Sequence, residues 1–321
     1  MKMKLSTRCR SGLFALSAIL LAAIAGAPGL AEAGATKIRI AFPSGMNGQI
    51  IVTMREAGIA AKHDLDAEFL SFQYGPPMME ALASGNVDAV VTSLMPITSF
   101  ASKAPGKIKV VAALGNSSHS LMVAQDSPIK ALSDLKGKQL AVSFGSDSHL
   151  DTLVTLTKAG IDPKADAKLL NVRPNELVLT LEKKFADAIV IRQPQVLRLQ
   201  EQFNARIVHT WPFRFVTIVR SDYMKENPDA REKYVAALRE SVFYIATHKE
   251  QAAKWFGAHL RIDPVIVQKV SNDDPNYNIK SMEEVQVELT PAVKTILTDW
   301  VVAAHKFGMI KTSVDPQVLF P

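Results

Sequence analysis

Apolar and polar positions along the chain follow two alternating periods, one typical of strands and the other typical of helices. Residues 37–42 place apolar side chains at every second position, which predicts a half-buried strand. Residues 49–62 follow with a pattern that predicts a helix. The alternation continues, and further strands are predicted at 65–71, 87–92, 108–114, 140–143, 168–172, 188–191, 206–209 and 215–220.

Helical segments between and after these strands define the fold class. They are predicted at 78–83, 150–158, 229–248, 249–258, 264–270 and 291–307. Strands that alternate with helices indicate an α/β fold with a mainly parallel sheet. In such a sheet, ligands bind outside the carboxyl ends of the strands. The loops after the strands are therefore the candidate site, and before residue 120 they offer Asn47, Tyr74, Ser93 and Asn116.

Residues 135–160 combine a strand, a turn rich in glycine and serine, and a helix. Such a turn directs backbone N–H groups and small hydroxyls beyond the strand end, where the helix dipole adds partial positive charge. His149 would lie in the first turn of the helix, either facing a ligand or as an ordinary polar residue. The stretch predicts a seat for an anionic group, formed by Ser143, Gly145, Ser146 and Ser148.

Arginines that follow strands are the candidate partners for a negative charge. Arg192 and Gln193 follow the strand at 188–191, and an arginine there could form two parallel hydrogen bonds with a carboxylate or sulfonate. The alternative is a surface arginine paired with an acidic neighbour. An exposed arginine in an open cleft would contribute little to folding stability. Arg173 and Arg214 are further candidates for the same role.

Two carboxylates of the same helix, Asp147 and Asp151, lie one helical turn apart. Such a pair could serve acid–base chemistry, but a solvated first helical turn is the preferred interpretation, because acidic side chains favour that end of a helix. The histidines have no metal-ligand spacing, and neither a Ser-His-Asp order nor a Gly-x-Ser-x-Gly elbow occurs. The sequence therefore predicts no metal, no cofactor and no catalytic residue.

A family resemblance rests on residues 132–138 (LSDLKGK), residues 140–142 (LAV) and the turn Gly145-Ser146-x-Ser148-His149. These segments resemble the second lobe of the periplasmic solute-binding proteins of nitrate, sulfonate and taurine ABC importers. The resemblance implies a two-lobe periplasmic binding protein fold of type II, with parallel-type sheets flanked by helices and a two-strand hinge. It also implies capture of a small organic anion by hinge closure. Relatives often have Trp-Glu-Pro where this chain has Arg-Gln-Pro at 192–194, a departure from the family pattern.

The resemblance also implies how the chain is divided into lobes and which partners it binds. Two crossings between lobes, near 117–120 and 211–215, would assign residues 34–119 and 216–321 to lobe I and residues 120–215 to lobe II. We expect a monomer that delivers its small-molecule ligand to an ABC permease, with its ATPase, at the inner membrane.

The first 33 residues have the pattern of a secretory signal peptide. A cationic segment that ends at Arg10 precedes an apolar segment at 13–25, and Ala31-Glu32-Ala33 fits a small-x-small cleavage site. Cleavage there would begin the mature chain at Gly34 and place it in the periplasm. A membrane anchor is the alternative, but the apolar segment is short for a membrane span.

Composition excludes several other classes of function. Of the 321 residues, 48% are hydrophobic and 21% are charged, which is typical of a globular chain. The formal net charge of +6 would fall to +3 without residues 1–33, and no basic run suggests binding of nucleic acid. Cys9 is the only cysteine and lies in the expected signal peptide, so the mature chain would have no disulfide and no thiolate.

Two alternative functions remain on the same fold. Sulfinate desulfinases and thiamine-pyrimidine synthases resemble this family, but the former depend on a cysteine nucleophile and the latter usually carry a cysteine-rich segment. The mature chain would have neither. A ligand-sensing module for a membrane receptor would need the same cleft and stays open. The preferred interpretation is a binding protein that performs no chemistry.

Overall fold

A computed structural model describes residues 34–321, and the expected signal peptide at 1–33 lies outside the described residues. One eight-stranded sheet, of order β2-β1-β3-β8-β4-β7-β5-β6, forms the centre. The strands are β1 (Thr36–Pro43), β2 (Leu65–Phe72), β3 (Ala89–Thr92), β4 (Ile108–Val123), β5 (Gln139–Val142), β6 (Lys168–Asn171), β7 (Ala188–Arg192) and β8 (Arg206–Arg220).

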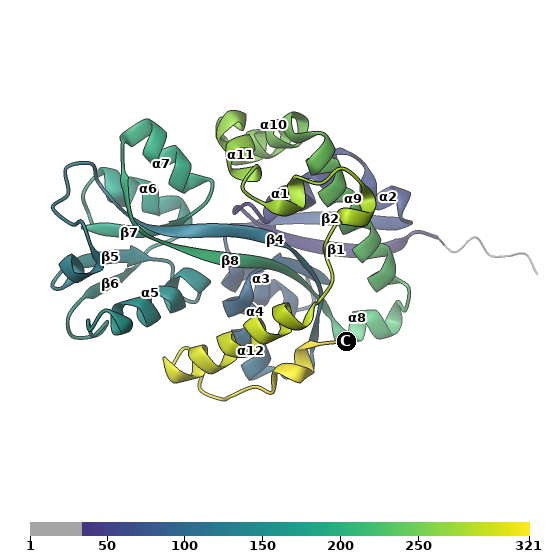
Figure 1. Ribbon diagram of the computed structural model, residues 1–321. Coiled ribbons are helices and arrows are strands. Elements are labelled where there is room, and N and C mark those ends of the chain that lie inside the picture. The colour runs from purple at the N-terminus through teal and green to yellow at the C-terminus, as the bar shows by residue number, and fades with distance from the viewer. Residues whose placement is uncertain (1–33) are drawn as a thin grey trace, which may run out of the picture. The chain divides into compact units, whose positions relative to one another are not determined.

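Two groups of three parallel strands are joined by one long antiparallel pair (Figure 1). β1 pairs with β2 and β3, and β5 pairs with β6 and β7, in parallel in each case. β4 and β8 pair from Ile108 opposite Arg220 to Val123 opposite Arg206, so both strands run through the two groups. We call β2-β1-β3 with its helices the first half, and β7-β5-β6 with its helices the second half.

The long pair corrects the sequence interpretation of residues 115–117 and 210–214. The sequence predicts that the strand from 108 ends before 115, and that 206–209 and 215–220 are separate strands, whereas β4 and β8 are each continuous. The reason is their mutual register, which places Ser117 opposite Phe213 and His119 opposite Trp211. Each segment supplies the hydrogen-bond partners that the other's backbone needs. The two expected crossings between lobes therefore lie side by side.

The helices differ from the predicted set mainly at their ends. The predicted helix at 49–62 is divided at Gly58, which has a φ of 64°. The helices α4, α6, α7 and α8 have no counterpart among the predicted ones. The α-helices are α1 (Gly48–Glu56), α2 (Ile59–Lys62), α3 (Gly75–Ala83), α4 (Leu94–Lys103), α5 (Asp147–Lys158), α6 (Pro174–Glu182), α7 (Gln195–Phe203), α8 (Ser221–Glu226), α9 (Ala230–Thr247), α10 (Lys249–Leu260), α11 (Pro264–Ser271) and α12 (Pro291–Lys306).

Helices cover both faces of the sheet (Figure 1), and the short strands β3, β5 and β7 are accordingly mostly apolar and buried. In β1, Ile40 and Phe42 face a core formed with α1, α9, α10 and α11, whereas Ala41 faces a core formed with α3, α4 and α12. In the second half, α5 packs on one face, and α6 and α7 pack on the other. Within residues 34–321, none of the helices combines the length and the apolar character needed to cross a membrane.

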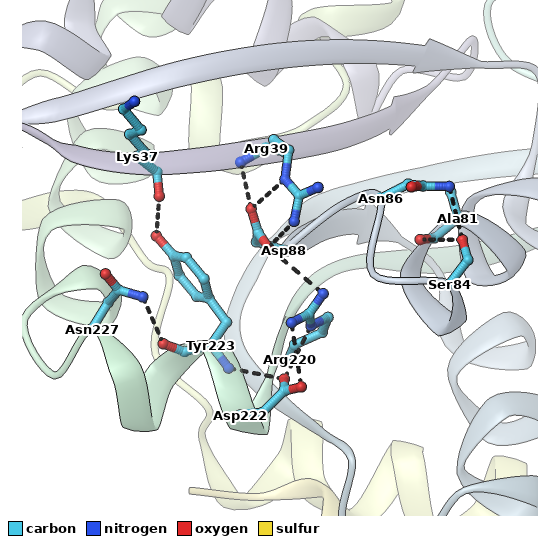
Figure 2. Close-up of polar contacts among 10 residues, drawn as sticks. All are labelled: Lys37, Arg39, Ala81, Ser84, Asn86, Asp88, Arg220, Asp222, Tyr223 and Asn227. Atoms are coloured by element: carbon cyan, nitrogen blue, oxygen red, sulfur yellow. Dashed lines mark hydrogen bonds and ion pairs between the residues drawn. The ribbon is translucent and has the colours of Figure 1, made fainter.

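A network of ion pairs around the buried Asp88 connects three strands at the amino end of β3 (Figure 2). Asp88, which is 4% exposed, accepts hydrogen bonds from the backbone N–H of Arg39 at 2.9 Å and from its Nη2 at 2.7 Å. Arg220 lies 3.8 Å from Asp88 and also binds Asp222. The network ties β1, β3 and β8 together on the side opposite to Ser93, which follows the carboxyl end of β3.

Candidate functional site

A pocket of about 410 Å³ lies at the carboxyl ends of β1, β2, β5, β6 and β7. The first half contributes the loops that follow Pro43 and Phe72, together with the end of α10. The second half contributes the turn after β5 and the residues that follow β6 and β7. This is the position that the predicted parallel strands favour for a ligand. Six predicted site residues line it, namely Tyr74, Ser143, Ser146, Ser148, Arg192 and Gln193.

The hydroxyls of the serines in the expected anion seat already have hydrogen-bond partners within the protein. Ser143 Oγ donates to the carbonyl of Val172 at 2.8 Å, and Ser146 Oγ donates to the carbonyl of Ser143 at 2.6 Å. Ser146 Oγ and Ser148 Oγ are hydrogen-bonded to each other at 2.7 Å. A hydroxyl has a single hydrogen, so Ser148 must donate to Ser146 in this arrangement. The positive end of α5, rather than these hydroxyls, is then the part of the turn that favours an anion.

Arg192 is the last residue of β7 and points between the two halves. Its Nη2 lies 3.2 Å from Ser93 Oγ in the first half, and its guanidinium carbon lies 4.4 Å above the ring of Phe213. Only 22% of the side chain is exposed, and Asp147 Oδ1 lies 4.0 Å from Nη2. Burial lowers the pKa of Arg192, while Asp147 and Asp151 oppose that effect. Arg192 is therefore a partly buried, paired cation and not the exposed arginine that the sequence suggests.

Asp147 corrects the prediction of a solvated first turn. Its side chain is fully buried, and its carboxylate accepts the backbone N–H groups of Met95 at 2.8 Å and Leu94 at 3.3 Å. Burial raises the pKa of Asp147, and the nearby charge of Arg192 acts in the opposite direction. Asp147 is the first residue of α5 in the second half, and its carboxylate binds the N-terminal N–H groups of α4 in the first half. The side chain therefore links the two halves directly.

Asp151, one turn further along α5, is also more buried than the sequence predicts. Its side chain is 20% exposed, and Oδ2 lies 2.9 Å from Nε2 of the fully buried His119, without the alignment of a hydrogen bond. Burial raises the pKa of Asp151 to about 7. Burial, with a contribution from Arg192, lowers the pKa of His119 to about 3. The imidazole is therefore neutral at neutral pH, and the pair contributes at most one negative charge beside Arg192.

The other predicted site residues lie outside the pocket lining. Ser93 touches it only through Arg192. Asn47 is fully buried at the start of α1, and neither polar atom of its side chain has a hydrogen-bond partner among residues 34–321. His149 stacks on Phe144 at 4.2 Å between ring centroids, and burial lowers its pKa to about 4. His149 and Gly145 line a different cavity, beside Phe307.

Asn116 and Arg214 lie opposite each other in the β4–β8 pair. Both line a separate cavity of about 250 Å³, next to Asp274. The Asp274 carboxylate accepts the backbone N–H of Asn116 at 2.8 Å. The structure therefore does not bring these two residues together with Arg192, and their role as ligand contacts stays a prediction.

Several lining residues have no signal in the sequence that would assign them to the site. His259 and Leu260 end α10, and reach the pocket because α10 packs beside the first half. His259 Nε2 lies 3.2 Å from Ser71 Oγ, and burial lowers the pKa of its imidazole. Ser44 and Gln73 follow β1 and β2, so the rule that loops after strands line the site could have found them. Among residues 34–321, no group of three or more side chains is arranged to hold a metal ion.

Known proteins resemble this chain in sequence, and a solved structure resembles it in fold. A binding protein of Brucella abortus (strain 2308) is 25% identical over 301 residues, which are 90% of this chain and 92% of that one. The taurine-binding periplasmic protein of Escherichia coli (strain K12) is 25% identical over 203 residues, 58% of this chain and 62% of that one. The solved periplasmic aliphatic sulphonate binding protein SsuA from Escherichia coli matches with a TM-score of 0.73 and 19% identity, over 89% of this chain and 92% of that one.

These likenesses confirm both the family resemblance and the predicted fold class. The structural neighbour has the same helix-flanked α/β fold, and the two Escherichia coli proteins are named for taurine and aliphatic sulphonate, which are among the solutes to which the resemblance pointed. The NMT1/THI5-like family matches residues 51–252, which is more than half of the sequence. The chain belongs to the NMT1/THI5-like family.

Proposed function

We propose that the chain is the exported solute-binding subunit of an ABC importer and captures a small organic anion, of the sulfonate or carboxylate type. The observation that carries this proposal is Arg192, which directs a positive charge into a pocket lined from both halves. The pocket volume of about 410 Å³ suits a small organic molecule. The names of the relatives support the same class of ligand, since taurine and aliphatic sulphonates are organic sulfonates.

Binding would proceed by closure of two lobes around the ligand. We assign residues 34–119 and 216–321 to lobe I and residues 120–215 to lobe II. The hinge would lie where the paired strands β4 and β8 pass from one lobe to the other. A ligand that touches loops of both lobes binds the closed state better than the open one, and this difference in affinity drives closure. The contact of Asp147 with the first residues of α4 would favour the same closed state.

The chain would bind its ligand without changing it and deliver it to a permease with its ATPase. The absence of cysteine after Cys9 supports this over a desulfinase-like enzyme, which needs a thiolate. Residues 1–33 would direct export to the periplasm. Sequencing of the exported protein should begin at or within about two residues of Gly34, because signal peptidase cleaves after small residues. An intact Met1 on a membrane-held protein would contradict the signal peptide.

The binding proposal is tested with a panel of small sulfonates and carboxylates, by thermal shift and then by calorimetric titration. Ligand at about 100 times its dissociation constant should stabilise the folded chain by roughly 2.7 kcal/mol. Arg192→Gln should weaken binding roughly thirtyfold or more, because it removes a charge-assisted contact from a closed cleft. The control is Arg173→Gln, an exposed arginine outside the pocket lining. Equal affinities of the two variants would remove Arg192 from the site. Mass spectrometry should recover the ligand unchanged.

A further inference from the structure

The pocket lining carries one formal charge. Among the residues that the structure describes, Arg192 is the only lysine or arginine of the lining, and no aspartate or glutamate lines it. His259 also lines the pocket, but burial lowers the pKa of its imidazole, which is therefore neutral at neutral pH. The other polar lining groups are uncharged hydroxyls and amides, such as those of Ser44, Gln73 and Asn175.

The carboxylates nearest to Arg192 are not available to a ligand. Asp147 is fully buried, lies outside the lining, and already accepts two backbone N–H groups of α4. Asp151 also lies outside the lining and is directed at His119, 2.9 Å away. Both carboxylates lie behind the lining and reduce the positive charge that Arg192 presents to the pocket. The pocket therefore offers less than one full positive charge and no partner for a cation.

Apolar groups complete the lining. Phe72, Tyr74, Leu177 and Leu260 come from four different elements or loops of the two halves. Such groups favour the uncharged part of an organic ligand, because burial of apolar surface is favourable and burial of an unpaired charge is costly. An ammonium group in this pocket would have no carboxylate partner and would be repelled by Arg192. A second anionic group would have no second cation.

We infer that the pocket selects a singly charged organic anion whose remaining body is uncharged, and that it rejects zwitterions and dianions of the same size. The inference rests on the proposed function and narrows its ligand class. Although one relative is named for taurine, which is a zwitterion at neutral pH, the lining of this pocket provides no carboxylate that would pair with the ammonium group of taurine.

The test compares two pairs of ligands in which a methyl group replaces an ammonium group of similar size, together with one dianion. Propanesulfonate and taurine have the same length, with a methyl group in one where the other has an ammonium group. Butyrate and β-alanine form the same pair with a carboxylate head, and ethanedisulfonate is the dianion. In calorimetric titrations at neutral pH, propanesulfonate should bind at least about tenfold more tightly than taurine, or butyrate than β-alanine, whichever head group the pocket prefers. Ethanedisulfonate should bind more weakly than propanesulfonate.

A charge introduced into the lining should change this selectivity. Gln73 is an exposed lining residue of the first half, whereas Arg192 belongs to the second half. Gln73→Glu should reduce the preference for propanesulfonate over taurine by roughly tenfold, because the new carboxylate attracts the ammonium group. Gln73→Met, which removes the amide without adding charge, should leave the preference unchanged.

The outcomes separate this inference from the proposal on which it rests. Equal or tighter binding of taurine or β-alanine by the wild-type chain would overturn the inference and leave an anion-binding function intact. An unchanged preference in Gln73→Glu would overturn the electrostatic explanation. Failure of all five compounds to bind would overturn the proposed function, and the inference with it.

Discussion

Arg192 interacts with groups on two sides. On one side it lines the pocket, and on the other it lies 4.0 Å from the buried carboxylate of Asp147. A buried carboxylate without a cation is costly, so Arg192 has a structural role in addition to any contact with a ligand. Its contact with Ser93 also means that it touches both halves of the sheet.

Arg192→Gln should therefore lower the stability of the ligand-free protein. The expected loss is about 1–3 kcal/mol in urea unfolding, because the variant leaves Asp147 without its nearest cation. This replaces the sequence-based expectation that an exposed arginine contributes little to folding. The double variant with Asp147→Asn should lose less than the sum of the two single changes. Additive losses would show that the two side chains do not interact.

Asp151 should make stability depend on pH. Its pKa is raised from 3.8 to about 7 in the folded state, so the folded chain binds the proton more tightly, and this contribution to stability is lost as pH rises from about 4 to 7. The pKa of His119 is lowered from 6.5 to about 3, which makes stability rise with pH between those values. The two effects oppose each other between about pH 4 and 6.5.

Asp151→Asn removes the effect of Asp151, so the difference in stability between the variant and the wild type isolates that effect. The free energy of unfolding of the variant relative to the wild type should increase by about 2–4 kcal/mol between about pH 4 and 7. Urea unfolding at several pH values measures this difference. The charges of Arg192, His209 and Lys158 lower the pKa of Asp151 and so oppose the effect of burial, which moves the midpoint of the change but not its direction. A stability difference that is constant with pH would contradict the buried carboxylic acid.

At the scale of elements, the network around Asp88 and the contacts around Asp147 connect different parts of the sheet. Asp88 ties β1, β3 and β8 at the amino end of β3 (Figure 2). Asp147 ties α5 to α4 near the pocket, at the carboxyl ends of the strands. The first should therefore affect folding alone, and the second should affect both folding and ligand binding.

Asp88→Asn should lower the free energy of unfolding by about 2–3 kcal/mol, because it leaves Arg39 and Arg220 without their shared buried anion. The matched control is Asp222→Asn, whose side chain is 62% exposed and whose pair with Arg220 should contribute less than about 1 kcal/mol. Calorimetric titration should find the ligand affinity unchanged in both variants. Weaker binding by Asp88→Asn would show that the amino end of β3 is coupled to the pocket.

At the scale of the described chain, residues 34–321, the pair formed by β4 and β8 connects the two halves of the sheet. Other strands belong to one half, whereas these two run through both. A hinge at residues 117–119 and 211–213 would bend two paired strands at the same place. Closure by such a hinge needs little local rearrangement, because few residues carry the change in direction.

Small-angle scattering should show a smaller radius of gyration when a binding anion is added to the ligand-free protein. The reason is that a ligand held by both lobes stabilises the closed state. Sodium chloride at the same ionic strength serves as the control without an organic ligand. A radius that stays unchanged with saturating ligand would contradict hinge closure and indicate that the halves are already closed without it.

The sequence by itself determined the α/β class, the order of the strands along the chain and the Gly/Ser turn before α5. These features depend on the hydrophobic period and on residues adjacent in the chain, which are local signals. It also identified Ser143, Ser146, Ser148 and Arg192 as residues that follow strands, and the structure places all four in the pocket lining. Their contact with a ligand stays a prediction.

Only the tertiary structure decided which residues pair and which are buried. Asp147 accepts hydrogen bonds from Leu94 and Met95, and β4 pairs with β8, because segments distant in the chain pack together. The same packing brings His259 into the pocket and carries Arg214 into a separate cavity. Burial changes the energy of a charge far more than sequence neighbours do, so the protonation of Asp151 and the pairing of Arg192 could not be predicted from the local pattern.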